Sequence, residues 1–232
     1  MTRRVPRHAV VIASGGLDST ATAYLLAGQG ASVSMLSFDY GQRHRRELHS
    51  AAVIASRLGV RHDVVDLTSV TKLLGGSALT DSTVDVPDGS YNDTTMRATV
   101  VPNRNAIMLE IGAAAAVAAG ADAVAFGAHS GDHFIYADCR PDFFQKIERS
   151  IRAGNEGLLA DGFRLLAPFL HVTKADIVQA AAELKVPFEL TWSCYRGGEV
   201  HCGTCGTCTE RREAFSLAGV CDPTPYATGG VR

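Results

Sequence analysis

The chain has 232 residues, of which 46% are hydrophobic and 20% charged, and its formal net charge is −2. This composition predicts a globular protein with one full α/β domain and a small appendage. The mild charge argues against broad electrostatic capture of nucleic acid, and no apolar run is long enough to span a membrane. The basic N-terminus is not followed by a signal-peptide core, so we expect a cytoplasmic protein without stable nucleic-acid or membrane partners.

Strand-like and helix-like segments alternate along the chain. We expect strands over 8–13, 31–38, 62–67, 121–126 and 163–168, separated by helices over 19–29, 46–58, 104–119, 141–153 and 174–184. This alternation predicts a doubly wound, Rossmann-like parallel sheet, whose ligands bind at the carboxyl ends of the strands. The polar stretch 68–103 breaks the pattern and is expected to be a functional or mobile loop, and the end of the chain an irregular tail.

The first strand runs directly into the loop SGGLDST, which opens a helix. Gly15 and Gly16 permit a tight turn close to a ligand, and the unpartnered amides of the following helix favour a phosphate. Asp18 is the exceptional member, because a carboxylate repels phosphate unless it orients the loop or a magnesium ion bridges the two. An ordinary N-cap by Ser or Asp is the structural alternative.

This loop has neither the lysine of a Walker A loop nor the glycine spacing of a dinucleotide fingerprint. It resembles the PP-loop of the ATP pyrophosphatases, which split ATP between the α and β phosphates and attach AMP to a substrate oxygen. The resemblance implies that ATP is bound by Ile12, Ala13, Ser14, Gly15, Gly16, Leu17, Asp18, Ser19, Thr20, Ala21 and Thr22. A non-catalytic nucleotide-binding module is a competing interpretation of the loop alone.

Four of the six cysteines fall close together, at Cys194, Cys202, Cys205 and Cys208. In a reducing compartment such a cluster indicates a metal more than disulfides. Four thiolates suit tetrahedral zinc, and a closed shell of four ligands leaves no position for a catalytic water. We therefore expect a structural zinc site that pins the C-terminal segment. An iron–sulfur cluster is the main alternative, because C-x-x-C-x-x-C also occurs in such proteins.

Further polar residues gather where strands end or helices begin. Residues 38–46 place arginines and a histidine at a helix start, where the helix dipole disfavours cations, so they form a solvated basic face or a phosphate clamp. Residues 103–105 are more polar than an N-cap needs. Residues 127–140 follow a buried strand and form either a site for a polar heterocycle or a non-specific loop. The side chain of Lys174 is expected either to reach a phosphate or to lie over the surface of its own helix.

Taken in chain order, SGGLDST, FDYGQRH, VPNRN, GDH with YADCRPDF, TKADI and the cysteine spacing resemble the 7-cyano-7-deazaguanine synthases of queuosine and 7-deazapurine biosynthesis. The resemblance covers residues 8–215. It implies a ligase that converts 7-carboxy-7-deazaguanine and ammonia to the nitrile, with ATP adenylating first the acid and then an amide. One departure is Asn103, which stands where many bacterial members have glycine.

The resemblance also implies roles for individual residues. Asp18, Arg104 and Lys174 are expected to act in catalysis on the phosphates, with Asp18 near magnesium. The expected substrate contacts are Tyr40, Gln42, Arg43, Asn103, Asp132, Tyr136, Asp138 and Arg140. The implied cofactors are ATP, magnesium and zinc.

We expect two parts in the chain, a PP-loop ATP-binding domain over 1–185 and a four-cysteine zinc segment over 186–232 that packs on it. We also expect a homodimer. Three alternative functions stay open: a relative that stops at the amide, a relative that serves DNA modification, and a PP-loop tRNA thiolase. A thiolase usually brings an added RNA-binding domain, for which this chain has little room.

Overall fold

A five-stranded parallel sheet forms the centre of the protein. The computed structural model describes residues 4–73, 76–89, 95, 97–134 and 136–227. Its strands lie in the order β3-β2-β1-β4-β5, and all the pairs between them are parallel. Their bounds are β1 His8–Ile12, β2 Ser32–Asp39, β3 Arg61–Asp66, β4 Ala123–Ala125 and β5 Arg164–Leu166. The prediction of a doubly wound parallel sheet is therefore confirmed.

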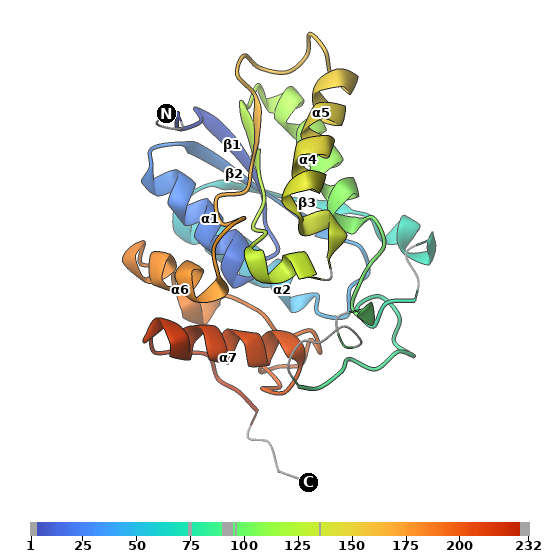
Figure 1. Cartoon of the computed structure of the whole chain (residues 1–232), viewed down its shortest axis with the longest axis vertical. Helices are drawn as coiled ribbons and strands as arrows, with labels where there is room; N and C mark the ends of the chain where they lie inside the picture. The colour runs from blue at the N-terminus through green and yellow to red at the C-terminus, as the bar shows by residue number, and fades with distance from the viewer. Residues whose placement is uncertain (1–3, 74–75, 90–94, 96, 135, 228–232) are drawn as a thin grey trace.

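Helices cover both faces of the sheet (Figure 1). Those on one face are α1 (Leu17–Gly28) and α2 (Arg46–Leu58), and those on the other are α4 (Arg104–Ala119) and α5 (Pro141–Gly154). The chain leaves β1 toward β2 first and later returns to pair β4 on the other side of β1. This reversal creates a crevice at the carboxyl ends of β1 and β4, where open α/β sheets bind ligands.

The alternation of side chains along β1 explains its burial on both faces. Val10 and Ile12 pack toward α4 and α5, whereas Ala9 and Val11 pack toward α1 and α2. Successive residues of a strand point to opposite faces, so a continuous apolar run is what a strand covered on both sides requires. The small alanine at position 9 has no exposed surface, which agrees with close packing of helices on this side of the sheet.

A further layer covers the outer side of α1. It consists of α6 (Lys174–Glu183) and α7 (Gly206–Ala218), which lie side by side in Figure 1. Ile177 of α6 and Phe215 of α7 share one apolar cluster with Leu17 of α1. Helix α7 was not expected from the sequence, because it begins inside the cysteine motif with Gly206 and Thr207, which are weak helix formers.

The described residues between 68 and 103 are more than a surface loop. After a 3-10 turn over Thr68–Leu73, Ala78 and Leu79 are fully buried, and Leu79 belongs to the same core cluster as α4 and α5. The backbone amide of Arg43 donates to the carbonyl of Leu79 over 2.8 Å. This segment therefore packs against the loop that comes after β2, close to the ligand edge of the sheet.

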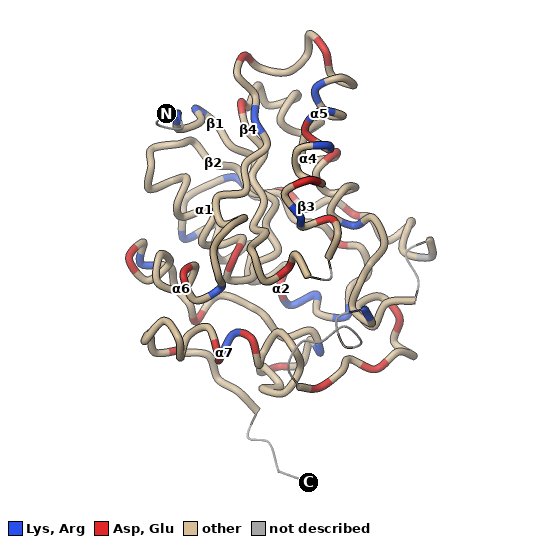
Figure 2. The backbone as a smooth tube through the Cα atoms, in the orientation of Figure 1, with Lys and Arg blue, Asp and Glu red and all other residues tan. Residues whose placement is uncertain are grey.

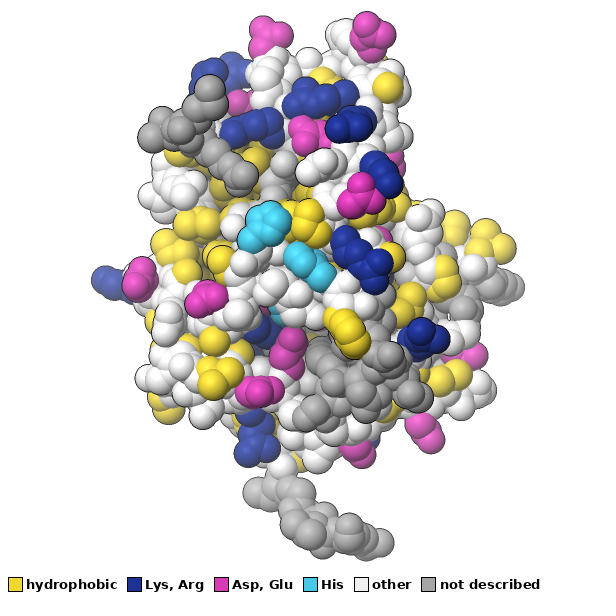
Figure 3. Space-filling model, in the orientation of Figure 1, with side chains coloured by type: hydrophobic (Ala, Val, Ile, Leu, Met, Phe, Trp, Pro, Cys, Tyr) yellow, Lys and Arg dark blue, Asp and Glu magenta, His cyan; other side chains and the backbone are white. Residues whose placement is uncertain are grey.

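Charges of both signs are intermixed over the surface. Figure 2 shows acidic and basic positions together along α5, α6 and α7, and the face drawn in Figure 3 carries basic and acidic side chains beside one another. Among the described residues, no helix is long and apolar enough to cross a membrane. The proposed division of the chain at residue 185 stays a prediction, although α6 and α7 pack together across it.

Candidate functional site

The SGGLDST loop turns tightly between β1 and α1. Gly15 has a φ of +79°, and a Cβ there would lie 2.2 Å from the carbonyl oxygen of Glu47 in α2, so only glycine fits. The N-cap of α1 is Gly16, which makes no side-chain capping bond. The alternative of an ordinary Ser or Asp N-cap is therefore wrong. The helix begins without a side chain over its first amides, as an anion site requires.

The hydroxyls of the loop differ in their availability. Thr20 and Thr22 are fully buried, and their hydroxyls donate to the carbonyls of Gly16 and Asp18 over 2.7 and 2.9 Å. The Ser14 side chain is exposed and lies 3.2 Å from the hydroxyl of Ser19. Thr20 and Thr22 therefore brace the first turn of α1, while Ser14 faces the open side of the loop.

A pocket opens beside this loop, at the carboxyl ends of β1, β2 and β4. Its walls come from five segments far apart in the sequence. The lining residues are Ile12, Ala13, Ser14, Asp18, Ser19, Phe38, Tyr40, His44, Glu47, Leu48, Arg104, Asn105, Met108, Phe126, Gly127, Ala128, Asp132, Tyr136, Cys139 and Tyr195. The lining includes five of the residues expected to bind ATP, namely Ile12, Ala13, Ser14, Asp18 and Ser19. It also includes Arg104, expected to act in catalysis, and the expected substrate contacts Tyr40, Asp132 and Tyr136.

A network of charged side chains adjoins this pocket, and two of its members, Asp18 and Asp132, line the pocket. The ammonium of Lys174, at the start of α6, lies 3.1 Å from Asp18 Oδ2 and 2.8 Å from Glu210 Oε2. His129 Nε2 lies 4.0, 3.6 and 3.9 Å from carboxylate oxygens of Asp18, Asp132 and Glu210 respectively. Three carboxylates and two basic groups from four elements therefore meet beside the SGGLDST loop, which we call the phosphate loop.

This network sets the ionisation of its members. Burial opposes the charge of Asp18, but Lys174 and His129 outweigh it and lower the pKa of the carboxyl. The pKa of Asp132 is raised, first by burial and then by the nearby carboxylates, against the pull of His129 and Lys174. Burial opposes the charge of Lys174 as well, yet Asp18 and Glu210 raise its pKa. Asp18 and Lys174 are thus held charged.

One oxygen of Asp18 has no partner. Asp18 Oδ1 is buried and makes no hydrogen bond among the described residues, while Oδ2 is shared with Lys174. Buried polar atoms normally have a hydrogen-bond partner, so an exception in a pocket wall marks a place for a ligand. A carboxylate oxygen beside a phosphate loop suits a magnesium ion, which prefers oxygen ligands.

Another wall of the pocket combines aromatic and amide groups. Burial raises the pKa of Tyr40 to about 12, although the positive charge of Arg104 opposes this shift. The Tyr136 hydroxyl lies 2.7 Å from that of Thr99, and both are buried. The side-chain amide of Asn105 donates to Cys139 Sγ over 3.4 Å. This wall is partly aromatic and contains the guanidinium of Arg104 beside Tyr40.

Five of the expected substrate residues do not line the pocket, namely Gln42, Arg43, Asn103, Asp138 and Arg140. Arg43 donates to two carbonyls within 81–84, both over 3.1 Å. Arg140 donates to the carbonyls of residues 133–134 over 2.8 and 3.2 Å. These side chains hold neighbouring backbone in place, and their expected contact with substrate stays a prediction.

The backbone conformation at position 103 explains why an asparagine is found there. Asn103 precedes α4 with a φ of 59°, in the left-handed region. Only glycine, asparagine and aspartate adopt this region readily. Asparagine is one of the few residues with a side chain that adopt this conformation readily, and its side chain is exposed, outside the pocket.

Sequence reasoning missed several residues of the site. His129 and Glu210 belong to the charged network, and His44, Glu47 and Tyr195 line the pocket. Glu210 was missed because its helix was not expected. His44 was noted only as part of a basic segment, although a histidine at a helix start beside the ligand edge of a sheet is a usable signal.

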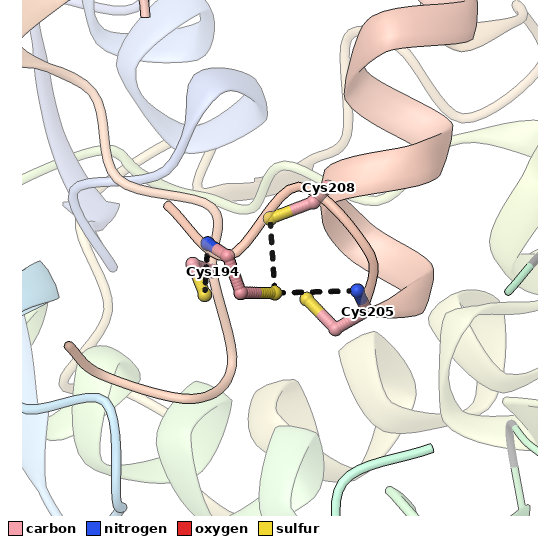
Figure 4. Close-up of side chains that lie close together, drawn as sticks. Cys194, Cys205 and Cys208 are labelled. Atoms are coloured by element: carbon pink, nitrogen blue, oxygen red, sulfur yellow. Dashed lines mark hydrogen bonds between the residues drawn. The ribbon is translucent and has the colours of Figure 1, made fainter. Parts of the chain in front are cut away.

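The four cysteines come together at the start of α7 (Figure 4). Their sulfur atoms all lie within 4.8 Å of one another, and Cys194, Cys205 and Cys208 are buried. Cys202 Sγ and Cys208 Sγ are 3.9 Å apart. A tetrahedron of Zn–S bonds of about 2.3 Å places sulfurs about 3.8 Å apart. The cluster could therefore bind one metal ion.

Buried Arg211 supports the segment around the cysteines. It comes after Cys208 by less than one turn of α7 and has no exposed surface. Its guanidinium donates to Thr191 over 2.7 Å, to the carbonyl of Phe188 over 3.1 Å, and to Asp222 over 3.1 Å. Because it joins residues before and after α7, it fixes the helix that carries both Cys208 and Glu210.

Comparison with solved structures defines the class of protein. The crystal structure of a 4-thiouridine synthetase–RNA complex with bound ATP matches 91% of this chain and 50% of its own chain, with a TM-score of 0.51 and 18% identity. At this identity the likeness concerns the fold alone. Together with the loop geometry, it places the chain among the PP-loop α/β folds.

Comparison of sequences defines the family. The model of the family described as queuosine biosynthesis protein QueC matches residues 8–219. The 7-cyano-7-deazaguanine synthase of Rhizobium rhizogenes is 56% identical over 94% of this chain and 91% of its own length. That of Ruegeria pomeroyi is 56% identical over 94% of both. This chain belongs to the QueC family, and the resemblance found in its motifs is confirmed.

Proposed function

We propose that this protein is an ATP-dependent carbon–nitrogen ligase that converts 7-carboxy-7-deazaguanine and ammonia to 7-cyano-7-deazaguanine. The observation that carries the proposal is a pocket lined by the phosphate loop, with Asp18 paired to Lys174, and by the aromatic side chains of Tyr40 and Tyr136. It occurs in a chain that is 56% identical to 7-cyano-7-deazaguanine synthases over nearly its whole length.

The charged network suits the activation of a carboxylate. A carboxylate is a poor electrophile because its leaving group would be oxide, whereas an acyl adenylate can release AMP. Transfer of AMP to the substrate oxygen expels pyrophosphate, whose charge must be stabilised. We propose that the amides at the start of α1 bind these phosphates together with Lys174, which is paired with Asp18 of the loop, and with Arg104, which lines the pocket.

Asp18 is the residue that we propose to hold magnesium. Its unpartnered Oδ1 supports this role. When bound, the ion supplies neutralisation of the pyrophosphate charge. Lys174 and His129 keep the Asp18 carboxyl ionised through a lowered pKa, so that it can serve as a ligand at neutral pH.

The aromatic wall is the proposed site of the deazaguanine ring. Tyr40 and Tyr136 offer aromatic surface, and Asn105 and Asp132 offer hydrogen-bonding groups at its edges. We propose that Gln42, Arg43, Asp138 and Arg140 act on substrate binding through the backbone that they hold, since each contacts the chain around the pocket.

For the cysteine cluster we propose a structural zinc ion. The sulfur separations suit a single ion, and backbone amides donate to two of the thiols, from Cys202 to Cys194 Sγ over 3.4 Å and from Cys205 to Cys202 Sγ over 3.3 Å. Such donors favour the thiolate. Four sulfurs close the coordination shell, so the ion would hold the start of α7 and take no part in the reaction.

We also propose a homodimer located in the cytoplasm. The alanine-rich outer side of α4, with exposed Ala114 and Ala118, supports helix packing between two copies, because small residues allow close approach. Light scattering of the purified protein tests the dimer; a single species with the mass of one chain would contradict it.

One experiment tests the catalytic proposal. The purified protein is incubated with 7-carboxy-7-deazaguanine, ATP, magnesium and ammonium, and the products are followed by mass. We expect ATP-dependent loss of the acid, transient amide, and release of nitrile, AMP and pyrophosphate. Accumulation of the amide alone would favour the relative that stops there. No ATP-dependent loss of the acid would contradict the proposal. The zinc and iron contents of the same sample distinguish a zinc ion from an iron–sulfur cluster at the four cysteines.

A further inference from the structure

His44 is a buried histidine in the wall of the pocket that the proposed roles leave unused. It lies in the turn that precedes α2 and is 3% exposed. Its ring packs against that of Tyr195, with centroids 5.2 Å apart. A Cβ on Gly197 would lie 3.0 Å from His44 Cα, so this loop packs closely over the turn. The position of the imidazole is therefore fixed from two sides.

Glu47 orients the imidazole ring. Its Oε2 lies 3.3 Å from His44 Nε2, and its Oε1 accepts a hydrogen bond from Gln42 Nε2 over 3.1 Å. Gln42 also bonds the carbonyl of Phe38 and the amide of Tyr40 over 2.9 Å each. The carboxylate is thus held beside Nε2. We assign the ring proton to Nε2, which faces the carboxylate, so that Nδ1 is the nitrogen with the lone pair.

His44 Nδ1 has no hydrogen-bond partner among the described residues, although it is buried. A histidine that serves only packing is expected to have both nitrogens satisfied, since a buried unpaired acceptor costs free energy. A carboxylate that orients one nitrogen of an imidazole while the other faces a ligand is the usual arrangement of a catalytic base.

The other histidine of the pocket edge differs in this respect. His129 Nδ1 accepts the backbone amide of Gly131 over 3.1 Å, and its Nε2 lies within 4.0 Å of three carboxylates. Both of its nitrogens are engaged. His129 therefore serves the charged network, whereas His44, of these two histidines, has a nitrogen without a hydrogen-bond partner among the described residues.

The His44–Glu47 pair adjoins the phosphate loop. The carbonyl oxygen of Glu47 would lie 2.2 Å from a Cβ at Gly15, so the first turn of α2 packs directly on the loop. His44 and Ser14 line the same pocket. The pair is therefore next to the place where a carbon activated by AMP must lie if the phosphate loop holds the nucleotide.

We propose that His44 is the catalytic base that removes protons from the substrate nitrogen, with Glu47 as its positioning residue; this rests on the proposed function. Ammonia attacks the acyl-adenylate carbon, the C–N bond forms, the C–O bond breaks, AMP leaves with its electron pair, and Nδ1 takes one proton from nitrogen. A second ATP then adenylates the amide oxygen and releases pyrophosphate. The nitrogen next loses two protons while AMP leaves, which gives the nitrile. Nδ1 takes each proton in turn and returns it to water.

The test separates activation from the nitrogen chemistry. His44→Gln and His44→Ala are compared with wild type in two assays, acid-dependent exchange of pyrophosphate into ATP and formation of amide and nitrile. We expect exchange within about twofold of wild type and product formation lowered about 100-fold or more, the usual contribution of a general base. Added imidazole should partly restore product formation in His44→Ala. Glu47→Gln should show the same split with a smaller loss.

His49→Gln is the matched control, because His49 lies on the same helix and is exposed; it should equal wild type in both assays. Product formation by His44→Gln at the wild-type rate would overturn the inference and leave the proposed function standing. Loss of exchange together with product formation would assign His44 to binding or folding and overturn it too. Absence of exchange in wild type would instead defeat the proposed function itself.

Discussion

The four-cysteine cluster takes all its ligands from residues 194–208, whereas the charged network beside the phosphate loop takes them from distant parts of the chain. Lys174 and Asp18 are 156 residues apart in sequence, and Lys174 and Glu210 are 36 apart. The first site needs two tight turns and the start of one helix. The second needs α1, α6 and α7 to be packed in place. A local site can form early in folding, while an assembled site depends on the whole fold.

The two regions meet in α7. Its first turn carries Cys208, and Glu210 and Arg211 come shortly after it. Arg211 anchors the helix to residues before and after it, and Glu210 reaches Lys174. The helix that begins at the cysteine cluster therefore also carries one carboxylate of the charged network. A substitution that disrupts the cysteine cluster should for this reason also disturb the charged network.

The largest expected effect tests whether the cysteine cluster supports the fold. Cys205→Ser should lose bound metal and greatly reduce the free energy of unfolding, since structural zinc sites contribute about 10 kcal/mol or more in small domains. Metal analysis and chemical denaturation measure this. Cys221→Ser is the control, because Cys221 is exposed and lies outside the cluster. If the Cys205→Ser protein binds as much metal as wild type and has the same free energy of unfolding, the cysteine cluster does not support the fold.

Arg211 tests whether buried polar contacts, besides the metal, hold the cysteine segment. Arg211→Met should destabilise the protein by about 3–5 kcal/mol, because it leaves Asp222 without its buried partner. Urea denaturation gives the value. Exposed Arg212→Met on the same helix should change stability by no more than about 0.5 kcal/mol. Equal effects of the two substitutions would show that Arg211 has no special role.

Substitution of Gly127 tests the close packing of the segment after β4 on the phosphate loop. A Cβ there would lie 2.9 Å from Asp18 C and Ser19 N. Gly127→Ala should therefore push the segment after β4 away from the phosphate loop, lower stability by about 1–3 kcal/mol, and reduce acid-dependent pyrophosphate exchange. Gly154→Ala has open space around its Cβ and should be neutral or slightly stabilising. Unchanged exchange in Gly127→Ala would contradict the argument.

The smallest expected effect concerns the ionisation of Asp18. Its pKa is lowered in the folded protein from an ordinary value of 3.8, so its charge stabilises the fold above that pH and this contribution is lost as pH falls through the folded pKa. Asp18→Asn should cost about 1–2 kcal/mol at pH 7. Denaturation at several pH values should show the difference from wild type shrinking below about pH 4. A difference independent of pH would mean that charge is not its source.

Much of the fold was predictable because its elements are long and periodic. Helices α2 and α4 were predicted with the bounds that the structure gives them. Strand β4 is shorter than expected, three residues over Ala123–Ala125, since apolar residues beyond a strand's hydrogen-bonded part can still be buried. Helix α7 was missed because its first turn lies within the cysteine cluster, whose glycine and threonine residues do not carry a helical pattern.

By itself, the sequence determined the phosphate loop, the parallel sheet and the cysteine ligands, because each depends on residues that are adjacent or regularly spaced. Only the tertiary structure decided that Glu210 and His129 join Asp18 and Lys174, and that His44 is buried with one nitrogen unpaired within the part of the chain that the structure describes. These contacts depend on how α6 and α7 pack on α1 and how the turn before α2 packs on the phosphate loop. Such packing is set by the whole apolar core, and no local spacing encodes it.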